Sequence, residues 1–389
     1  MTAGWLEMPL GEVLRLEYGK PLERLDRRSD GKYPVYGANG EKDRSDRFYH
    51  DKPSIIVGRK GSAGEINLTE KKFWPLDVTY FVTFDEQKNN LRFLYFLLST
   101  LDLPSLAKGV KPGINRNEVY STRVRIPPLP EQQRIVAILD QAFDGIATAK
   151  ANAEKNLKNA REIFESHLNT VFTQRGEGWV ERKLENLCRF VRGPFGGSLK
   201  KTTFVSEGYA VYEQQHAIYD QFTKVRYFID EKKFQEMKRF ELSPGDLIMS
   251  CSGTMGRVAI VPNNIQPGII NQALLKLSPT EKILNSFLKA WMDSNCFQES
   301  IKNHSGGAAI QNVASVKILK EIRVPLPSVA EQKKAMDRIT EMQITTQHLE
   351  SIYQQKLAAL DELKKSLLHQ AFTGELTTSP DKQLDEALT

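Results

Sequence analysis

Two long stretches of the chain carry apolar residues at helical spacing. In the first stretch, residues 131–173, the apolar positions are Ile135, Leu139, Ala142, Ile146, Ala149, Ala153, Leu157, Ala160, Phe164, Leu168 and Val171. In the second, residues 331–374, they are Ile339, Met342, Leu349, Ile352, Leu357, Leu360, Leu363, Leu367 and Ala371. Steps of three and four residues place each set on one face of an α-helix. We therefore predict two amphipathic helices of about 43 residues, each roughly 65 Å long.

Prolines mark the start of both predicted helices. The segments "PPLPEQQ" (127–133) and "PLPSVAEQK" (325–333) stand immediately before the two apolar stripes. Proline fixes φ and keeps the residue before it out of the helical conformation, so each helix begins close to its prolines. Pro130 suits an opening helical position, and Ser328 with Glu331 has capping-box spacing.

Each apolar stripe needs a partner, because a single helix cannot bury it. We expect the two helices to pair with each other as a coiled coil. Twofold packing of two like units makes such a pair antiparallel. The alternative is that each helix packs on its own globular part, which a helix of this length would overhang.

The segments that precede the helices also resemble each other. "GWLEMPLGEVLRLEYG" (4–19) and "GWVERKLENLCRFVRG" (178–193) share Gly, Trp, Glu, Leu, Arg and Gly at an offset of 174. "SIIVGRKGSAGEI" (54–66) matches "DLIMSCSGTMGRV" (246–258), and both begin with a short apolar run typical of a buried strand. The chain therefore consists of two copies of one unit. The offset grows to 200 within the globular part and then stays constant along the helix, which is typical of a spacer of fixed length.

The predicted fold class is α+β or α/β, with two tandem globular domains rich in β-strand and two antiparallel helices related by pseudo-twofold symmetry. The expected boundaries are 1–130 for the first domain, 131–173 for the first helix, 174–330 for the second domain, 331–374 for the second helix and 375–389 for a flexible tail.

The positive charge of the chain is concentrated in the two globular parts. The formal net charge is +6. The globular segments carry a net positive balance, whereas both helical segments are slightly negative. This distribution favours a polyanionic partner such as nucleic acid, although Lys and Arg also serve simply to keep a surface hydrated. The 3 cysteines are far apart, and neither a secretory signal nor an apolar run long enough for a membrane span is visible, so we expect a cytoplasmic protein.

Sequence motifs for catalysis are missing. The sequence has no phosphate-binding loop of the G-x-x-x-x-G-K-[ST] type, no dinucleotide fingerprint and no histidine or cysteine spacing typical of a metal site. We therefore expect a binding protein that is not itself an enzyme and holds no metal or cofactor.

The doubled proline–EQ–helix module and the tandem layout resemble the specificity (S) subunits of type I restriction–modification enzymes. "YPVYGANG" (33–40) with "IIVGRKGSAG" (55–64) is similar to a common variant of the target-recognition domain in that family. The resemblance covers essentially the whole chain. It implies a non-catalytic subunit whose two domains each read one half of a split DNA target, while the helices set the spacing.

The same resemblance implies the partners. Two methyltransferase (M) subunits carrying S-adenosylmethionine would bind the scaffold and modify adenine. Restriction (R) subunits using ATP and Mg would join the full complex. Because the two domains differ in sequence, the double-stranded DNA target is expected to be asymmetric, as in proteins that read two half-sites.

Loops rich in glycine, cations and amides supply the candidate DNA contacts. The first domain offers Tyr36, Asn39, Arg59, Lys60, Ser62, Lys108, Lys111 and Arg116. The second offers Lys200, Lys201, Gln214, Gln215, His216, Ser252, Thr254, Arg257, Lys302 and His304. Lysines would bind phosphate, whereas Asn, Gln and Arg would read base edges. The structural alternative is that the G-x-x-G segments only form hairpin turns and that Asn39 serves the backbone.

Two other functional classes remain open at this stage. One is the specificity subunit of a related system whose partner fuses methylase and nuclease, which would have the same sequence features. The other is a coiled-coil scaffold with no DNA role, which DNA-binding measurements would distinguish.

Overall fold

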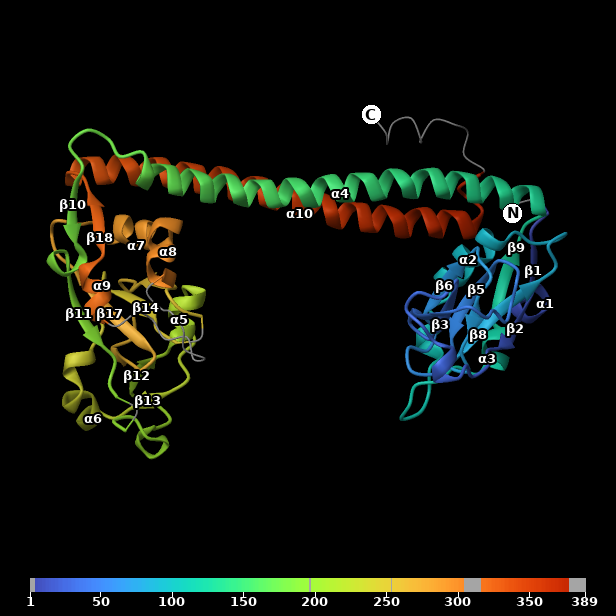
Figure 1. The fold of residues 1–389 in the computed structure, drawn as a ribbon, viewed down its shortest axis with the longest axis horizontal. Helices are drawn as coiled ribbons and strands as arrows, with labels where there is room; N and C mark the ends of the chain where they lie inside the picture. The colour runs from blue at the N-terminus through green and yellow to red at the C-terminus, as the bar shows by residue number, and fades with distance from the viewer. Residues whose placement is uncertain (1–3, 196, 253, 304–315, 378–389) are drawn as a thin grey trace. The chain divides into compact units, whose positions relative to one another are not determined.

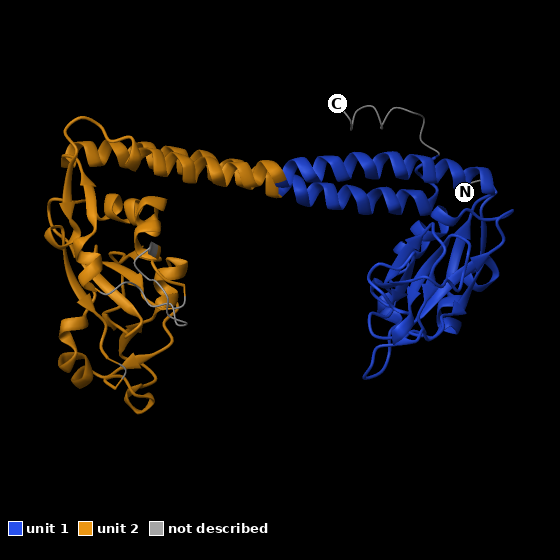
Figure 2. Cartoon of the chain, in the orientation of Figure 1, with its two compact units in different colours: residues 1–154, 355–389 blue, residues 155–354 orange. Residues whose placement is uncertain are grey.

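The computed structural model describes residues 4–195, 197–252, 254–303 and 316–377. The chain divides into two compact units (Figure 2): unit 1 comprises residues 1–154 and 355–389, and unit 2 comprises residues 155–354. Each unit thus contains one globular domain and a portion of both long helices. The division between the units falls within both long helices, so each helix contributes residues to both units. Most of the tail expected at 375–389 lies outside the described residues.

The described strands of unit 1 form three sheets. The antiparallel four-stranded sheet has the order β2 (Leu14–Tyr18), β8 (Thr79–Phe84), β5 (Ser54–Gly58), β6 (Ile66–Thr69). The second sheet has the order β4 (Gly40–Ser45), β3 (Tyr33–Gly37), β7 (Trp74–Pro75), and the third pairs β1 (Leu6–Pro9) with β9 (Arg123–Ile126). The helical elements of the domain are α1 (Leu10–Val13), η1 (Arg24–Asp26), α2 (Leu91–Thr100), η2 (Leu103–Leu106) and α3 (Arg116–Ser121).

Unit 2 repeats this arrangement. Its four-stranded sheet has the order β11 (Cys188–Arg192), β17 (Leu274–Pro279), β14 (Leu247–Ser250), β15 (Val258–Ile260). Its smaller sheets have the order β13 (Phe228–Ile229), β12 (Tyr209–Tyr212), β16 (Gly268–Ile270), and β10 (Val180–Lys183) beside β18 (Arg323–Leu326). The remaining elements are η3 (Leu184–Asn186), η4 (Lys201–Thr203), α5 (Gln214–Tyr219), α6 (Glu231–Glu236), η5 (Lys238–Phe240), α7 (Asn285–Asp293), α8 (Asn295–Asn303) and α9 (Val316–Glu321). The sequence repeat is therefore a repeat of sheet topology.

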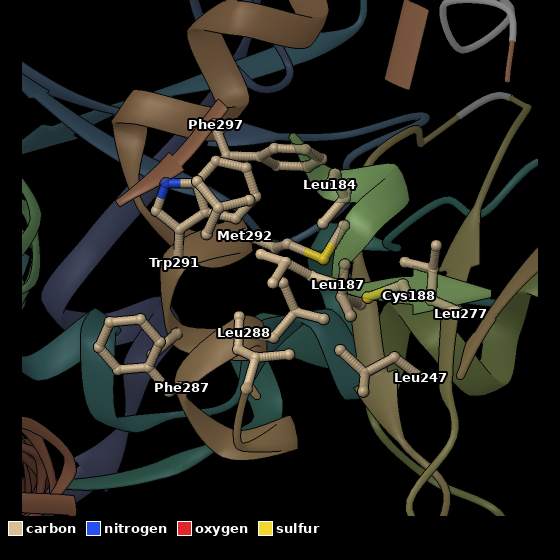
Figure 3. Packing of buried hydrophobic residues seen from close by; sticks show 14 of the residues in the cluster. Leu184, Leu187, Cys188, Leu247, Leu277, Phe287, Leu288, Trp291, Met292 and Phe297 are labelled. Carbon is tan, nitrogen blue, oxygen red and sulfur yellow. The ribbon is translucent and has the colours of Figure 1, made fainter. Parts of the chain in front are cut away.

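The predicted buried strands lie at the centre of each domain. β5 ("SIIVG") and β14 ("LIMS" of "DLIMS") are buried along their whole length. In unit 2, α7 covers the large sheet with Phe287, Leu288, Trp291 and Met292, which pack against side chains such as Leu247 (Figure 3). Burial of these aromatic and aliphatic side chains is the main source of stability of the domain.

Both long helices are present and slightly longer at their N-terminal ends than the pattern indicated. α4 spans Leu129–Thr173 and α10 spans Val329–Thr373. In unit 1, Lys150 pairs with Asp361 at 2.6 Å, and the Lys364 ammonium lies 5.0 Å from the centre of the Phe143 ring. Increasing residue numbers on α4 thus meet decreasing numbers on α10, so the helices are antiparallel, as predicted.

The contact between the helices follows a seven-residue repeat. On α4 the buried positions are Leu139, Ile146, Ala153 and Ala160. On α10 the repeat runs through Ile339, Thr346, Tyr353, Leu360 and Leu367, of which the last three are half-buried. A seven-residue repeat is the signature of a coiled coil. The sequence pattern was wrong at Ile352 and Leu363, which are 42% and 40% exposed, because it admitted only apolar residues and passed over Thr346.

A buried glutamine ties the start of each long helix to its domain. The amide nitrogen of Gln132 donates to Lys88 O (3.0 Å) and Pro127 O (2.9 Å), and its oxygen accepts from Asn90 N (2.8 Å). Gln332 makes the equivalent bonds to Lys282 O (2.9 Å), Pro327 O (3.1 Å) and Leu284 N (2.8 Å). Each side chain pairs with three backbone groups, of which the proline carbonyl is buried and the other two are partly buried. The "EQ" at both junctions therefore has a structural reason.

The second junction also contains the predicted capping box. Ser328 N and Ser328 Oγ both donate to the Glu331 carboxylate, at 3.0 and 2.9 Å, and Glu331 N donates back to Ser328 Oγ. These bonds satisfy free backbone N–H groups at the first turn of α10. At the first junction, Pro130 lies in the first turn of α4, where its missing N–H costs nothing.

The distal end of each helix also enters a domain core. Phe372 of α10 packs on Phe93 in unit 1, with ring centres 5.3 Å apart, and Phe172 of α4 packs on Phe287 in unit 2 at the same distance. Each domain is therefore held by the beginning of one long helix and the end of the other.

Candidate nucleic-acid interface

Two loops of unit 1 bring together the predicted cations of the first domain. The loop between β5 and β6 carries Arg59 and Lys60, and a hairpin closed by the Lys108–Gly113 bridge carries Lys111. Gly61 N donates to Pro112 O at 2.9 Å, and Ile114 N donates to Arg59 O at 3.0 Å. The two segments, 50 residues apart in sequence, therefore form one surface of unit 1, which we call the first loop surface (residues 58–64 and 108–116).

The cations on this surface have different environments. Lys60 and Lys111 are exposed and have no carboxylate within 4.0 Å among the described residues. Lys108, by contrast, pairs with Glu118 at 2.7 Å. Ser62 is exposed, so its hydroxyl is accessible to a phosphate. A concentration of unpaired positive charge on adjacent loops is the expected footprint of a site for a polyanion.

The glycines of the first loop surface are required by the turn, which was the structural alternative to a role in DNA contact. A Cβ on Gly58 would lie 2.1 Å from Ser62 O and 2.6 Å from Ala38 O, and Gly64 has a φ of +90°. The G-x-x-G pattern is therefore needed for the turn itself. This requirement concerns the glycines and leaves the side chains between them on the surface.

The "YGANG" segment forms the β3–β4 hairpin. Asn39 lies at its tip and is exposed, and its φ is negative, so the backbone tolerance of Asn for positive φ is not the reason for this residue. Tyr36 is buried, 9% exposed, and its ring packs edge-on against Phe73. Asn39 remains a candidate contact, whereas Tyr36 belongs to the domain core.

In unit 2, the predicted polar residues converge on α5 and the β14–β15 loop. Ser252 Oγ donates to Gln214 Oε1 at 3.1 Å, which joins residues from two separate sequence motifs. Gln215 is half-buried and donates to Glu213 Oε2 at 3.4 Å. Thr254 is exposed, and its carbonyl accepts a bond of 2.6 Å from Ser250 Oγ.

The structure contradicts the prediction that His216 contacts DNA. Its side chain is 0% exposed. Nδ1 bonds to the backbone of Glu213 and Nε2 lies 3.1 Å from Lys224 O, so both ring nitrogens are engaged. A histidine with two backbone partners and no exposed surface holds the first turn of α5 in place, and the sequence could not show that this side chain points into the domain.

Arg257 lies on the same loop, and its charge acts on the carboxyl group of Asp293. Burial raises the pKa of Asp293, while the nearby cations Lys289 and Arg257 act in the opposite direction. Lys289 pairs with Asp293 at 2.8 Å and approaches Asp220 to 3.8 Å. Arg257 is therefore partly compensated within the protein.

The remaining candidates of the second domain lie in other segments. Lys200 and Lys201 are exposed at the start of η4. Lys302 is exposed near the end of α8. His304 lies outside the described residues. Among the described residues, no hydrogen bond or ion pair joins Lys200 or Lys201 to the Gln214–Ser252 cluster.

Two residues at equivalent places in the repeat were not among the contacts predicted from the sequence. Tyr18 and Arg192 each end the first strand of the large sheet, immediately before the shared Gly19 and Gly193. Tyr18 is 47% exposed, and two arginines lie against its ring. The alignment of the two repeats could have pointed to them, because it places Tyr18 opposite Arg192 directly before the glycine that both copies share.

In the described part of the chain, no group of three or more His, Cys, Asp or Glu residues is placed so that it could hold a metal ion. Within the same residues, no helix is long and apolar enough to cross a lipid bilayer. Burial raises the pKa of Cys188 to about 12, which keeps this thiol protonated and unreactive at neutral pH.

The fold and the loop surfaces define a duplicated α/β protein on paired antiparallel helices, with polar and cationic loops in both copies. The family model described as "Type I restriction modification DNA specificity domain" matches residues 3–159 and 176–357. The chain therefore belongs to the type I restriction–modification DNA specificity family, as the resemblance predicted.

Individual relatives agree with this assignment. The chain is 25% identical over 324 residues to the EcoBI type I restriction enzyme specificity subunit of Escherichia coli, covering 75% of this chain and 67% of that protein. It is 21% identical to the MjaVIII specificity subunit of Methanocaldococcus jannaschii, with coverage of 96% and 93%.

Solved structures share the fold. The HsdS subunit from Thermoanaerobacter tengcongensis superposes with a TM-score of 0.61 at 18% identity, covering 97% of this chain and 98% of that one. A chain from a study of complex assembly and conformational transition of the type I R-M system superposes with a TM-score of 0.76, also at 18% identity, covering 97% and 99%. The fold class predicted from the sequence is thus confirmed.

Proposed function

We propose that this chain is the non-catalytic DNA-recognition subunit of a type I restriction–modification system and that it reads a bipartite, asymmetric DNA target. One unit reads each half-site. The observation that carries this proposal is the repeat itself: the same loops follow the same strands in both units, yet their side chains differ. Arg59, Lys60 and Ser62 of unit 1 correspond to Cys251, Ser252 and Thr254 of unit 2. Two units with the same backbone framework but different loop side chains are suited to recognise two different DNA sequences.

In this proposal the catalytic work belongs to partner subunits. Two methyltransferase subunits carrying S-adenosylmethionine bind the scaffold and methylate one adenine in each half-site. Restriction subunits that use ATP and Mg join them, and the assembly acts in the cytoplasm. The chain itself supplies binding and positioning through its loops and helices.

The test is to map methylated adenines across the genome of cells that express this chain with its methyltransferase. We expect methylation confined to one interrupted, non-palindromic sequence, and none in cells that express the methyltransferase alone. A gel-shift competition between the cognate duplex and random duplex, at a stated salt concentration, gives an independent measurement. Absence of sequence-restricted methylation together with absence of specific binding would exclude the proposal.

A further inference from the structure

Three separate elements of unit 1 meet at the exposed ring of Tyr18. Tyr18 ends β2, Arg59 belongs to the β5–β6 loop, and Arg116 begins α3. These elements all belong to the globular domain of unit 1 (Figure 1). The guanidinium carbon of Arg59 is 5.4 Å from the centre of the Tyr18 ring, and that of Arg116 is 4.8 Å from it. Both distances fall within the range of favourable cation–π contact.

The tyrosine ring is itself held firmly. Tyr18 pairs with Tyr80 across β2 and β8, and the two ring centres are 5.1 Å apart. Tyr80 is only 2% exposed, and its hydroxyl donates to Ile114 O at 3.2 Å. Burial raises the pKa of Tyr80, and its neighbour Tyr18 adds to this effect, so Tyr80 stays neutral at physiological pH. The arginines therefore rest on a fixed aromatic platform.

The orientation of Arg59 is further restricted by the backbone. Its Nε and Nη2 both donate to Asp77 O, at 3.0 and 2.6 Å. A guanidinium has five N–H donors, and these two bonds use only one side of it. The edge formed by Nη1 and the second Nη2 hydrogen takes no part in these two bonds. Arg116 is restrained more weakly, by a 3.5 Å contact between Nη1 and Leu16 O.

The charge of this cluster is uncompensated. Neither Arg59 nor Arg116 has a carboxylate within 4.0 Å among the described residues, whereas Arg123 of the same unit pairs with Glu7 at 3.2 Å. Two guanidinium groups over one ring repel each other. An arrangement that holds them together without an acidic partner is stabilised when an electron-rich ligand binds between or beside them.

Unit 2 also has a guanidinium at the corresponding corner of its large sheet, but it comes from a different strand position. Arg192 occupies the place of Tyr18, and Cys251 occupies the place of Arg59. Arg192 Nη1 donates to Leu274 O at 2.9 Å, and its charge lowers the pKa of Cys251 against the larger effect of burial, which raises that pKa to about 11. Both units thus fix a guanidinium at this corner of the sheet, but among the described residues only unit 1 provides the aromatic platform and the second arginine.

We propose that Tyr18 positions Arg59 and Arg116 as a rigid fork that reads guanine in the half-site recognised by unit 1. This inference rests on the proposed function and deepens it by naming a base and the residues that read it. The O6 and N7 acceptors of guanine in the major groove match a bidentate guanidinium. A phosphate needs only charge, whereas a base edge needs an oriented donor pair, which is what the ring and Asp77 O provide.

The test uses the chain in complex with its methyltransferase and measures methylation of duplexes in which each base of the target is varied singly. Arg59→Lys and Arg116→Lys keep the charge but lose the fork. We expect each to reduce methylation of the cognate duplex about 10-fold or more and to relax preference at a guanine of one half-site only, since a bidentate contact contributes about 1–3 kcal/mol of discrimination. Arg123→Lys, at an exposed ion pair of the same unit, is the matched control and should leave both halves unchanged.

Tyr18 is tested through the same readout. Tyr18→Phe keeps the ring and should retain the base preference, whereas Tyr18→Leu removes the platform and should relax preference at the same guanine as the two arginine variants. A loss that is equal for cognate and random duplexes in the lysine variants would show phosphate contact and overturn the inference. Unchanged methylation in both lysine variants would also overturn it. If wild-type complex shows no sequence-restricted methylation, the proposed function fails instead, so the two failures are distinguishable.

Discussion

At the scale of single residues, the glutamines after the junction prolines show that a short motif can be explained by the hydrogen bonds that backbone groups require. Gln132 and Gln332 are both fully buried, and each makes three bonds to backbone groups of its own domain. In the sequence, the Glu–Gln pair at each junction looks like part of an exposed helix surface. In the structure, its glutamine connects the start of the long helix to the backbone of the globular domain.

This role predicts a large stability effect for a small change. Gln132→Leu leaves Lys88 O, Pro127 O and Asn90 N without partners, and we expect it to reduce the free energy of unfolding by about 2–4 kcal/mol, because buried unpaired backbone groups cost about 1–3 kcal/mol each. Gln133→Leu, one residue further on the exposed side of α4, is the control and should change it by less than about 0.5 kcal/mol. Chemical denaturation gives both values. Equal effects of the two variants would contradict this role of Gln132.

The exposed lysines of the first loop surface lead to a separate prediction about salt. Lys60→Ala and Lys111→Ala should weaken binding of the complex to cognate and random duplex alike. Each should also reduce the slope of log binding constant against log salt concentration by about one, since one phosphate contact is lost. Lys52→Ala, at the ion pair with Glu86, serves as the control. A slope that stays unchanged in both variants would remove these lysines from the interface.

At the scale of elements, the helix pair depends on small residues in the seven-residue repeat. Ala153 and Ala160 are each 2% exposed, so α4 presents little side-chain volume at these places. The cross-helix ion pairs Lys150–Asp361 in unit 1 and Arg161–Glu350 in unit 2 lie at the partly exposed edges. Exposed pairs of this kind contribute at most about 1 kcal/mol. The apolar seam therefore provides most of the helix–helix stability.

Two alanines on α4 allow a matched test of the seam. Ala153→Asp introduces an unpaired charge at a buried position and should destabilise the chain by about 3 kcal/mol or more. Ala151→Asp makes the same chemical change at an exposed position of the same helix and should cost less than about 1 kcal/mol, chiefly through helix propensity. Thermal unfolding followed by far-UV circular dichroism compares the two. If both variants unfold at the same temperature, the helices do not pair through this face.

At the scale of the whole molecule, the duplication predicts a division of labour between the units. Exchanging residues 1–130 for the corresponding domain of another specificity subunit should change one half of the methylated sequence and leave the other half intact. The reason is that each globular domain has its own core and its own loops. Mapping methylated adenines for parent and chimaera provides the measurement. A change in both halves would show that the units do not recognise DNA independently.

The sequence by itself determined the repeat, the two long helices, the buried central strands and the family, because these depend on periodicity, proline chemistry and motifs that are local in the chain. Only the tertiary structure decided that Thr346 and Tyr353 rather than Ile352 and Leu363 follow the helix contact, that His216 is buried, and that Tyr18 gathers Arg59 and Arg116. The Tyr18 cluster depends on distant segments of the chain meeting at one corner of a sheet, and the helix contact depends on which faces of α4 and α10 meet. Local patterns carry no information about such meetings, since packing and strand pairing select the neighbours.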